Sequence, residues 1–229
     1  VSGRLYLMQN NFSAFSKGGS IKMIKIAVLA RLILSVISLA GIFLAVMSAQ
    51  ASNGFQETRI AYEIKKNIRQ GEVIELTAGN QQFLAIYQEG DQPAKQGGLI
   101  ILHGLGHNPD SPGVIRTLRT ALTASGWDTL SIQMPIPSME YTETDHASLV
   151  QEASPRITAA VNFLSEKKLA NQAIIAQDFN AAMAAGFLEQ AEKSTVDAFV
   201  MISLDGTRQP VIQSLSNIKQ PVLDLYGSR

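Results

Sequence analysis

Two short segments of the sequence combine residue types that can stabilise negative charge and attack an electrophile. The first is His103-Gly104-Leu105-Gly106, which directly follows the apolar run 99–102. Its glycines permit a tight turn in which the backbone N–H of Leu105 would face a cleft, with His103, Gly104 and Gly106 lining it. Such pre-aimed donors stabilise an oxyanion as it develops. The alternative is a plain turn in which His103 makes local hydrogen bonds, and the preceding apolar run favours the oxyanion-binding turn.

The second segment, Ala176-Gln177-Asp178-Phe179-Asn180, lies where an apolar run would pass into an Ala-rich helix. A carboxylate can act as a covalent nucleophile, and Asp tolerates the positive φ that such a turn demands. We therefore predict Asp178 as the catalytic residue, the N–H of Phe179 as a second oxyanion donor, and Gln177 as a residue lining the cleft. The competing interpretation is favoured: the serine and both glycines of a nucleophile turn are missing, and Asn180 would crowd the crossing, so the site is degenerate.

A triad would also need an acid and a base. The acid would follow the run 221–226, and Asp205 is an alternative that is more simply a turn residue. The base should be a histidine near the C-terminus, but none follows His146. His107 borders the oxyanion turn and is more simply a surface residue of a polar loop. Either the protein uses no triad or the sequence is a fragment, and we expect the fragment, because ending on a strand exposes a sheet edge.

The elements that must position these residues alternate between strands and helices. Apolar runs bounded by turn residues predict strands, and 3.6-residue periodicity predicts helices. The expected strands are 72–76, 82–87, 99–102, 129–134, 172–176, 198–204 and 221–226, and the main expected helices are 111–126, 145–164 and 180–191. The first two strands form a hairpin, and the alternation that follows predicts right-handed crossovers and a mostly parallel sheet.

Four segments also carry a resemblance to a known family. They are GGLIILHGLGHNPDSPG (97–113), GWDTLSIQMP (126–135), EASPRITAAVNFL (152–164) and PVLDLYGSR (221–229). From about residue 56 to the end, the chain resembles exported bacterial α/β-hydrolase-like proteins that are catalogued as a domain of unknown function. The resemblance implies an α/β fold: an α/β-hydrolase-like, mostly parallel sheet with an N-terminal antiparallel hairpin, here truncated at the C-terminus. It also implies export and a hydrolase ancestry, without a substrate.

Residues 1–51 have the pattern of an export signal and are not expected to be part of the folded domain. Lys22 and Lys25 precede the apolar run 26–46, and Ala49-Gln50-Ala51 follows it. This order predicts a signal peptide that is cut after Ala51; an uncleaved membrane anchor is the alternative. We interpret residues 1–22 as the result of reading the gene from too early a start. Both interpretations place the domain 52–229 outside the cytoplasm, in the periplasm or otherwise exported.

Composition narrows the possible functions. Of 19 basic and 19 acidic residues, five basic and no acidic ones lie in 1–51, so the remainder has 14 basic and 19 acidic residues. That acidic balance disfavours nucleic acid as a partner. There is no cysteine, no dinucleotide or phosphate-binding motif and no metal-ligand spacing, so we expect neither cofactor nor metal. An unknown small molecule is the expected partner, and the membrane is contacted only through the N-terminal segment. The preferred function is a hydrolase of ester or carbon–halide type; the alternative is a non-catalytic periplasmic binding or scaffolding protein.

Overall fold

The computed structural model describes residues 52–137, 146–192, 195–204 and 209–227. The predicted signal segment 1–51 and Asp205 lie outside the described residues. Across the described ranges, no helix is both long enough and apolar enough to cross a membrane.

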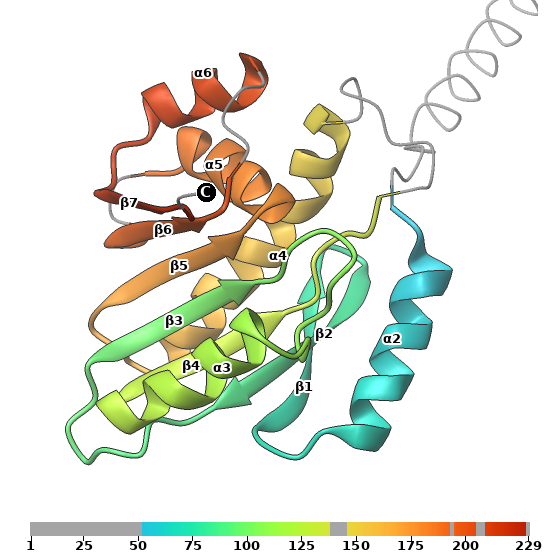
Figure 1. Ribbon diagram of the computed structural model, residues 1–229, viewed down its shortest axis with the longest axis vertical. Coiled ribbons are helices and arrows are strands. Elements are labelled where there is room, and N and C mark those ends of the chain that lie inside the picture. Colours follow the sequence, from blue (N-terminus) through green and yellow to red (C-terminus); the bar gives the residue numbers. More distant parts are fainter. Residues whose placement is uncertain (1–51, 138–145, 193–194, 205–208, 228–229) are drawn as a thin grey trace, which may run out of the picture. The chain divides into compact units, whose positions relative to one another are not determined.

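Seven strands form one sheet in the order β1-β2-β4-β3-β5-β6-β7 (Figure 1). β1 pairs with β2 and β2 with β4 in antiparallel fashion, whereas the pairs among β3, β4, β5, β6 and β7 are parallel. The strands are β1 (Glu72–Ala78), β2 (Gln81–Gln88), β3 (Gly97–Leu102), β4 (Trp127–Ile132), β5 (Gln172–Gln177), β6 (Ala198–Ile202) and β7 (Val222–Leu225). The predicted hairpin and mostly parallel sheet are confirmed.

The central strands are buried because helices cover both faces of the sheet. All six residues of β3 are buried, as expected for an apolar run in a parallel sheet. The register pairs Leu102 of β3 with Ala176 of β5. The carboxyl ends of these two strands therefore lie side by side, and the segments that follow them leave the sheet at the same edge.

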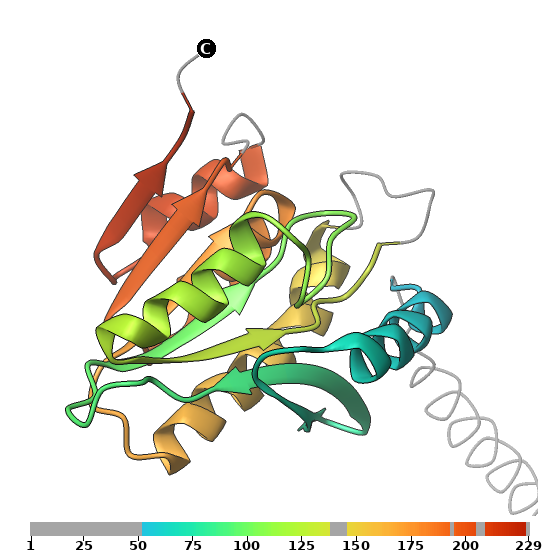
Figure 2. The same cartoon turned by 60° about the horizontal axis from the view of Figure 1, so that its bottom comes forward.

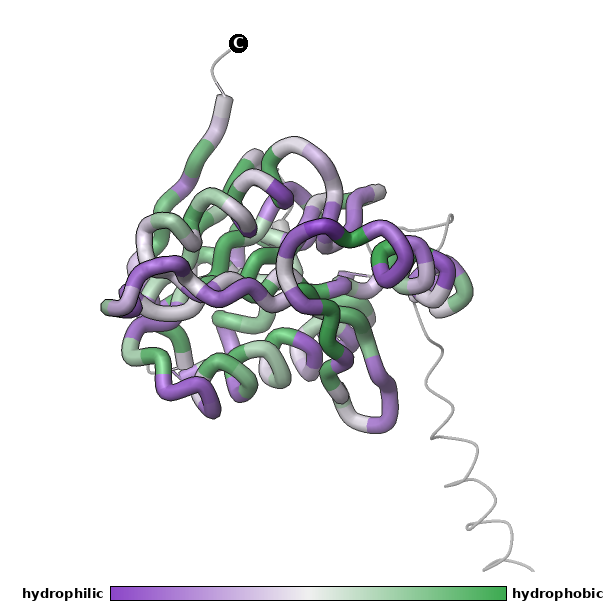
Figure 3. The backbone as a smooth tube through the Cα atoms, turned by 90° about the horizontal axis from the view of Figure 1, so that it is seen from below, coloured by the Kyte–Doolittle hydropathy of each residue, from purple (hydrophilic) through white to green (hydrophobic). Residues whose placement is uncertain are grey.

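The two faces of the sheet are covered by different numbers of helices. They are α2 (Gly54–Asn67), α3 (Val114–Ala121), α4 (His146–Glu166), α5 (Phe179–Gln190) and α6 (Gln209–Asn217), with a 3-10 turn η1 (Leu122–Ser125) after α3. α4, α5 and α6 pack against one another on one face, and α3 lies on the other (Figures 1 and 2). Figure 3 shows hydrophobic and hydrophilic stretches following one another along the backbone. The Ala-rich helix α5 is buried along most of its length, because it packs on the sheet and against α4 and α6.

The N-terminal helix α2 begins directly after Asn53 and precedes the hairpin. Asn53 caps it by accepting a hydrogen bond from the N–H of Gln56 (3.1 Å). Its apolar side packs on Leu84 and Ile86 of β2. These strand residues alternate with those that face α4, so α2 lies on the same face of the sheet as α3.

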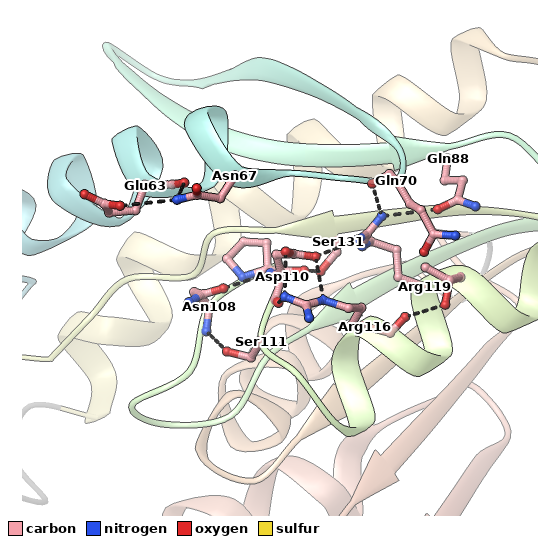
Figure 4. A network of polar contacts seen from close by, with 12 residues as sticks. Glu63, Asn67, Gln70, Gln88, Asn108, Asp110, Ser111, Arg116, Arg119 and Ser131 are labelled. Atoms are coloured by element: carbon pink, nitrogen blue, oxygen red, sulfur yellow. Dashed lines mark hydrogen bonds and ion pairs between the residues drawn. The ribbon is translucent and has the colours of Figure 1, made fainter.

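The loop between β3 and α3 is held by a polar network (Figure 4). Asp110 accepts hydrogen bonds from the guanidinium groups of Arg116 (2.9 Å) and Arg119 (2.6 Å). The helix expected over 111–126 begins later, at Val114: Gly113 holds the cap position, and the Ser111 hydroxyl accepts from the N–H of Asn108 (2.8 Å). The hydroxyl closes the loop instead of starting the helix.

Candidate active site

The segment after β3 folds into a tight turn. The carbonyl of Gly104 accepts a hydrogen bond from the N–H of His107 (3.1 Å), and Gly106 has φ +73°, the conformation that a type II turn requires at its third residue. The N–H of Leu105 donates to no acceptor among the described residues, and its side chain is exposed. The turn thus presents a backbone donor at the carboxyl edge of the sheet.

The segment after β5 keeps the backbone of a nucleophile turn although its sequence departs from the usual one. Asp178 has φ +54° and ψ −127°, outside the left-handed helical region that Asp tolerates. Its N–H donates to the carbonyl of Ile202 (2.8 Å), and its carbonyl accepts from the N–H of Ala181 in α5 (3.0 Å). The turn has therefore not relaxed, and the side chain at position 178 projects from a sharp bend between strand and helix.

The two turns approach each other closely. A Cβ atom placed on Gly104 would lie 3.3 Å from the Cβ of Asp178, 3.5 Å from its Oδ2 and 3.5 Å from the Cδ of Gln177. Gly104 therefore leaves the space that the Asp178 side chain needs. The half-buried Asp178 carboxylate receives no hydrogen bond from any described residue.

His103 is buried beneath the first turn and is engaged at both ring nitrogens. Nε2 accepts from the N–H of Met134 (3.2 Å), so the proton sits on Nδ1 and is donated to the carbonyl of Gly104 (3.0 Å). Burial lowers the pKa of His103 to about 4, against the smaller opposing effect of its bond to Gly104. The neutral ring joins the ends of β3 and β4, which makes it a positioning residue and leaves it no free nitrogen to act as a base.

Asn180 was expected only to crowd the crossing between strand and helix, but in the structure its side chain makes a defined hydrogen bond. Its side chain is 2% exposed. Nδ2 donates to the carbonyl of His103 (2.5 Å), which ties the start of α5 to the end of β3. Oδ1 is buried and has no hydrogen-bond partner. No sequence signal would have found this contact, because its two residues are 77 positions apart.

A small pocket of about 30 Å³ joins these features. Its wall is made by residues 103–107, 135–137, Phe179 and Asn180, and by Gln56 and Ile60 of α2. Hollows of about 490 to 540 Å³ occur elsewhere, along α2, α4 and the hairpin, but neither Asp178 nor the turn 103–107 lines them. Asp178 does not line the small pocket, but it lies beside Gly104, which does. Among these four hollows of the described residues, only the small pocket is lined by the turn 103–107, so we take it as the candidate site.

The other residues considered in the sequence analysis are less closely associated with this pocket. His107 is exposed and lines it. His146 begins α4 and is not among the lining residues. Phe179 is half-buried on the pocket wall, and its role as an oxyanion donor stays a prediction. Within the described ranges, no group of three or more His, Asp or Glu side chains could hold a metal ion.

Solved structures with the same architecture come from hydrolases. Est1E from Butyrivibrio proteoclasticus is 14% identical, with a TM-score of 0.54 over 69% of this chain and 77% of its own. The esterase Pf2001 from Pyrococcus furiosus gives 14% identity and a TM-score of 0.54 over 70% and 71% of the two chains. Dienelactone hydrolase from Anabaena variabilis is 16% identical, with a TM-score of 0.51 over 70% of this chain and 86% of its own. At these identities the likeness establishes the α/β-hydrolase fold alone.

Sequence comparison is consistent with that fold. Among curated proteins, no relative matches the chain. A family model described as "Protein of unknown function (DUF3530)" matches residues 49–148 and 137–229. These matches extend over most of the chain and include both turns of the candidate site. The chain therefore belongs to the DUF3530 family, and its fold is that of the α/β-hydrolases.

Proposed function

We propose that the protein is a hydrolase in which the Asp178 carboxylate attacks an alkylating substrate, such as a haloalkane, and forms a covalent ester. One observation carries the proposal: an unpaired carboxylate sits on a strained backbone turn and faces the glycine turn that follows β3. Backbone strain of this kind costs about 1–3 kcal/mol and persists where the surrounding structure enforces it, most often at functional sites. A side chain with no role would not need that conformation.

The chemistry of a carboxylate favours a carbon–halogen bond over an ester. An ionised carboxylate displaces a halide from a saturated carbon without any proton transfer: the C–O bond forms, the C–halogen bond breaks and the halide leaves with the electron pair. Attack on an ester carbonyl would instead produce an anhydride and expel an alkoxide. The first half of the reaction therefore needs only Asp178 and a pocket that binds the substrate.

The second half of the reaction needs a water molecule and a base. His103 is engaged at both nitrogens, whereas His107 lines the pocket with an exposed ring. We assign the base to His107, with the Leu105 N–H stabilising the oxyanion that forms as water attacks the alkyl ester. The esterases and the dienelactone hydrolase that share this fold support a hydrolytic outcome by analogy.

The test follows one adduct and one released ion. The full chain is incubated with 1-bromobutane, and we expect bromide release; in the full chain carrying His107→Gln, which lacks the proposed base, we also expect one butyl group per chain in the intact mass. Asp178→Asn should abolish both signals, because an amide is a poor nucleophile. The matched control is Asp224→Asn, which neutralises an exposed carboxylate on β7 and should leave both signals unchanged.

The alternative function has its own signature in the same experiment. A binding or scaffolding protein that keeps only the fold would release no bromide and carry no adduct. It would behave identically with and without the Asp178→Asn change. That result would refute the proposed chemistry.

We also propose that this hydrolase acts outside the cytoplasm. The support is the sequence pattern of 1–51, in which lysines precede an apolar run and Ala49-Gln50-Ala51 follows it. In a Gram-negative host, the periplasmic fraction should contain a protein whose first residue is Ser52. Recovery of the full chain from the cytoplasm would contradict this proposal and leave the chemistry of Asp178 untouched.

A further inference from the structure

We infer that Asn180 selects the substrate by accepting a hydrogen bond from an N–H group, so the preferred substrates are α-halo carboxamides. The inference rests on the proposed function of Asp178 and adds a specificity that the fold does not imply. It starts from a buried amide oxygen without a partner, which is a costly feature in a folded protein.

The orientation of the Asn180 amide is determined by its own hydrogen bond. Nδ2 donates to the carbonyl of His103 at 2.5 Å. A flipped amide would place Oδ1 against that carbonyl, and two acceptors would then repel each other. Oδ1 therefore keeps its position as an acceptor and can be satisfied only by a donor that the described residues do not supply.

The donor can come from the pocket that Asn180 lines. Its volume of about 30 Å³ suits one or two heavy atoms, such as the oxygen and nitrogen of a carboxamide. Leu105 lines the same pocket and offers an N–H that is free among the described residues. The site thus combines one donor with one acceptor, which matches the C=O and N–H of an amide.

The remaining part of such a ligand would meet Asp178. Asp178 does not line the pocket, but its carboxylate lies beside Gly104, which does. In the proposed pose the amide group lies between Leu105 and Asn180, and the adjacent CH2–halogen carbon extends past Gly104 to that carboxylate. The carboxylate oxygen forms a bond to that carbon as the halide leaves with the bonding electrons. The products are a carbamoylmethyl ester of Asp178 and a halide ion.

Two reagents that differ only in the presence of an N–H donor are used to test this inference. They are 2-chloroacetamide and chloroacetone, in which a methyl group replaces the NH2 group. The chain has no cysteine, so thiols do not consume either reagent. The rate of Asp178 modification is followed by peptide mapping in the full chain carrying His107→Gln, in which the proposed base is absent and the ester is retained. It is divided by the rate of each reagent with acetate ion. We expect the normalised rate to be about tenfold higher for the amide, the usual effect of one hydrogen bond.

Variants locate the selectivity at one side chain. Asn180→Ala should reduce the amide-to-ketone ratio about tenfold, to near one, by lowering the amide rate while the ketone rate stays within a factor of two. Asn162→Ala, an exposed asparagine on α4, is the matched control and should preserve the ratio. If Asn180→Ala does not fold, the ratio of the protein that keeps Asn180 still decides the question.

The outcomes separate the two proposals. Equal normalised rates at Asp178 for both reagents would overturn the role of Asn180 while supporting the nucleophile. A preference for the amide that persists in a folded Asn180→Ala protein would also overturn it. Absence of modification at Asp178 by either reagent would refute the proposed function itself, and this inference with it.

Discussion

Asp110 and Asp178 both follow central parallel strands, but their surroundings are opposite. The Asp110 carboxylate accepts from Nε and Nη2 of Arg116 (3.2 and 2.9 Å) and from Nη2 of Arg119 (2.6 Å) (Figure 4). The Asp178 carboxylate receives no hydrogen bond from the described residues and sits on strained backbone. The first arrangement stabilises a loop, and the second costs stability.

This difference indicates where function resides in the molecule. Structural polar groups are usually paired, so departures from pairing and from relaxed backbone are expected at functional sites. Around Asp178 three departures coincide: the strained turn, the free Leu105 N–H and the unpaired Asn180 oxygen. Leu105 and Asn180 line one pocket, and the strained turn adjoins it at Gly104. Together the three features argue for a working site more strongly than any of them alone.

The largest expected effect comes from breaking the paired carboxylate. Asp110→Asn leaves the Arg119 guanidinium, which is 1% exposed, without its ionic partner. We expect the free energy of unfolding in urea to fall by about 3 kcal/mol, because removing one member of a buried ion pair leaves the other charge uncompensated. Asp178→Asn should change it by less than about 0.5 kcal/mol. Equal losses in the two variants would remove the distinction between these carboxylates.

The next effect depends on pH and concerns His103. Its pKa of about 4 in the folded protein lies below the ordinary value of 6.5, so between these pH values the unfolded chain binds a proton that the folded protein does not. Stability should therefore be lost as the pH falls from 6.5 towards 4, by about 3 kcal/mol across the interval.

The measurement compares urea denaturation at several pH values in the unaltered protein and in His103→Gln, which cannot titrate there. The difference between their free energies of unfolding should shrink as the pH falls. His107→Gln removes a ring that makes a minor contribution to the lowered pKa of His103, so it should weaken this pH dependence only slightly. A pH-independent difference between the first two proteins would show that His103 is not buried in its neutral form.

The smallest effect is a gain in stability. Asp178→Gly would relieve the backbone strain at φ +54° and ψ −127°, a region that glycine occupies readily. Relief of the strain stabilises the folded protein, whereas the greater freedom of glycine stabilises the unfolded chain. The net result we expect is a rise of about 1 kcal/mol in the free energy of unfolding. Destabilisation of this variant in thermal or urea unfolding would mean that the Asp178 side chain makes a stabilising contact and that the comparison with Asp110 is mistaken.

The sequence predicts the sheet well because its signals are local. Apolar runs bounded by glycine and proline locate the strands, and the alternation with helices implies parallel pairing. Even so, a proline inside a predicted helix indicates a kink or a break, and the structure has the single helix α4 with Pro155 inside it. The helix expected over 111–126 begins only at Val114, since a sequence pattern does not reveal that the Ser111 hydroxyl is an acceptor within the loop.

Only part of the candidate site could be predicted from the sequence. The positions of Leu105 and Asp178 follow from the strand ends that precede them. The engagement of both His103 nitrogens and the contact between Asn180 and the His103 carbonyl depend on how β3, β4 and α5 meet in space. Such long-range contacts leave no periodicity or spacing in the sequence, so a missing glycine at position 180 looked like decay.

The most direct test of the account measures all carboxylates in one reaction. The folded full chain carrying His107→Gln, which lacks the proposed base and so retains the ester, is treated with 2-chloroacetamide at neutral pH, and tandem mass spectrometry quantifies the ester at every Asp and Glu. The account predicts that Asp178 carries nearly all of the label and that Asp110 carries none. Labelling spread over the exposed carboxylates, with Asp178 no more reactive than the others, would contradict it.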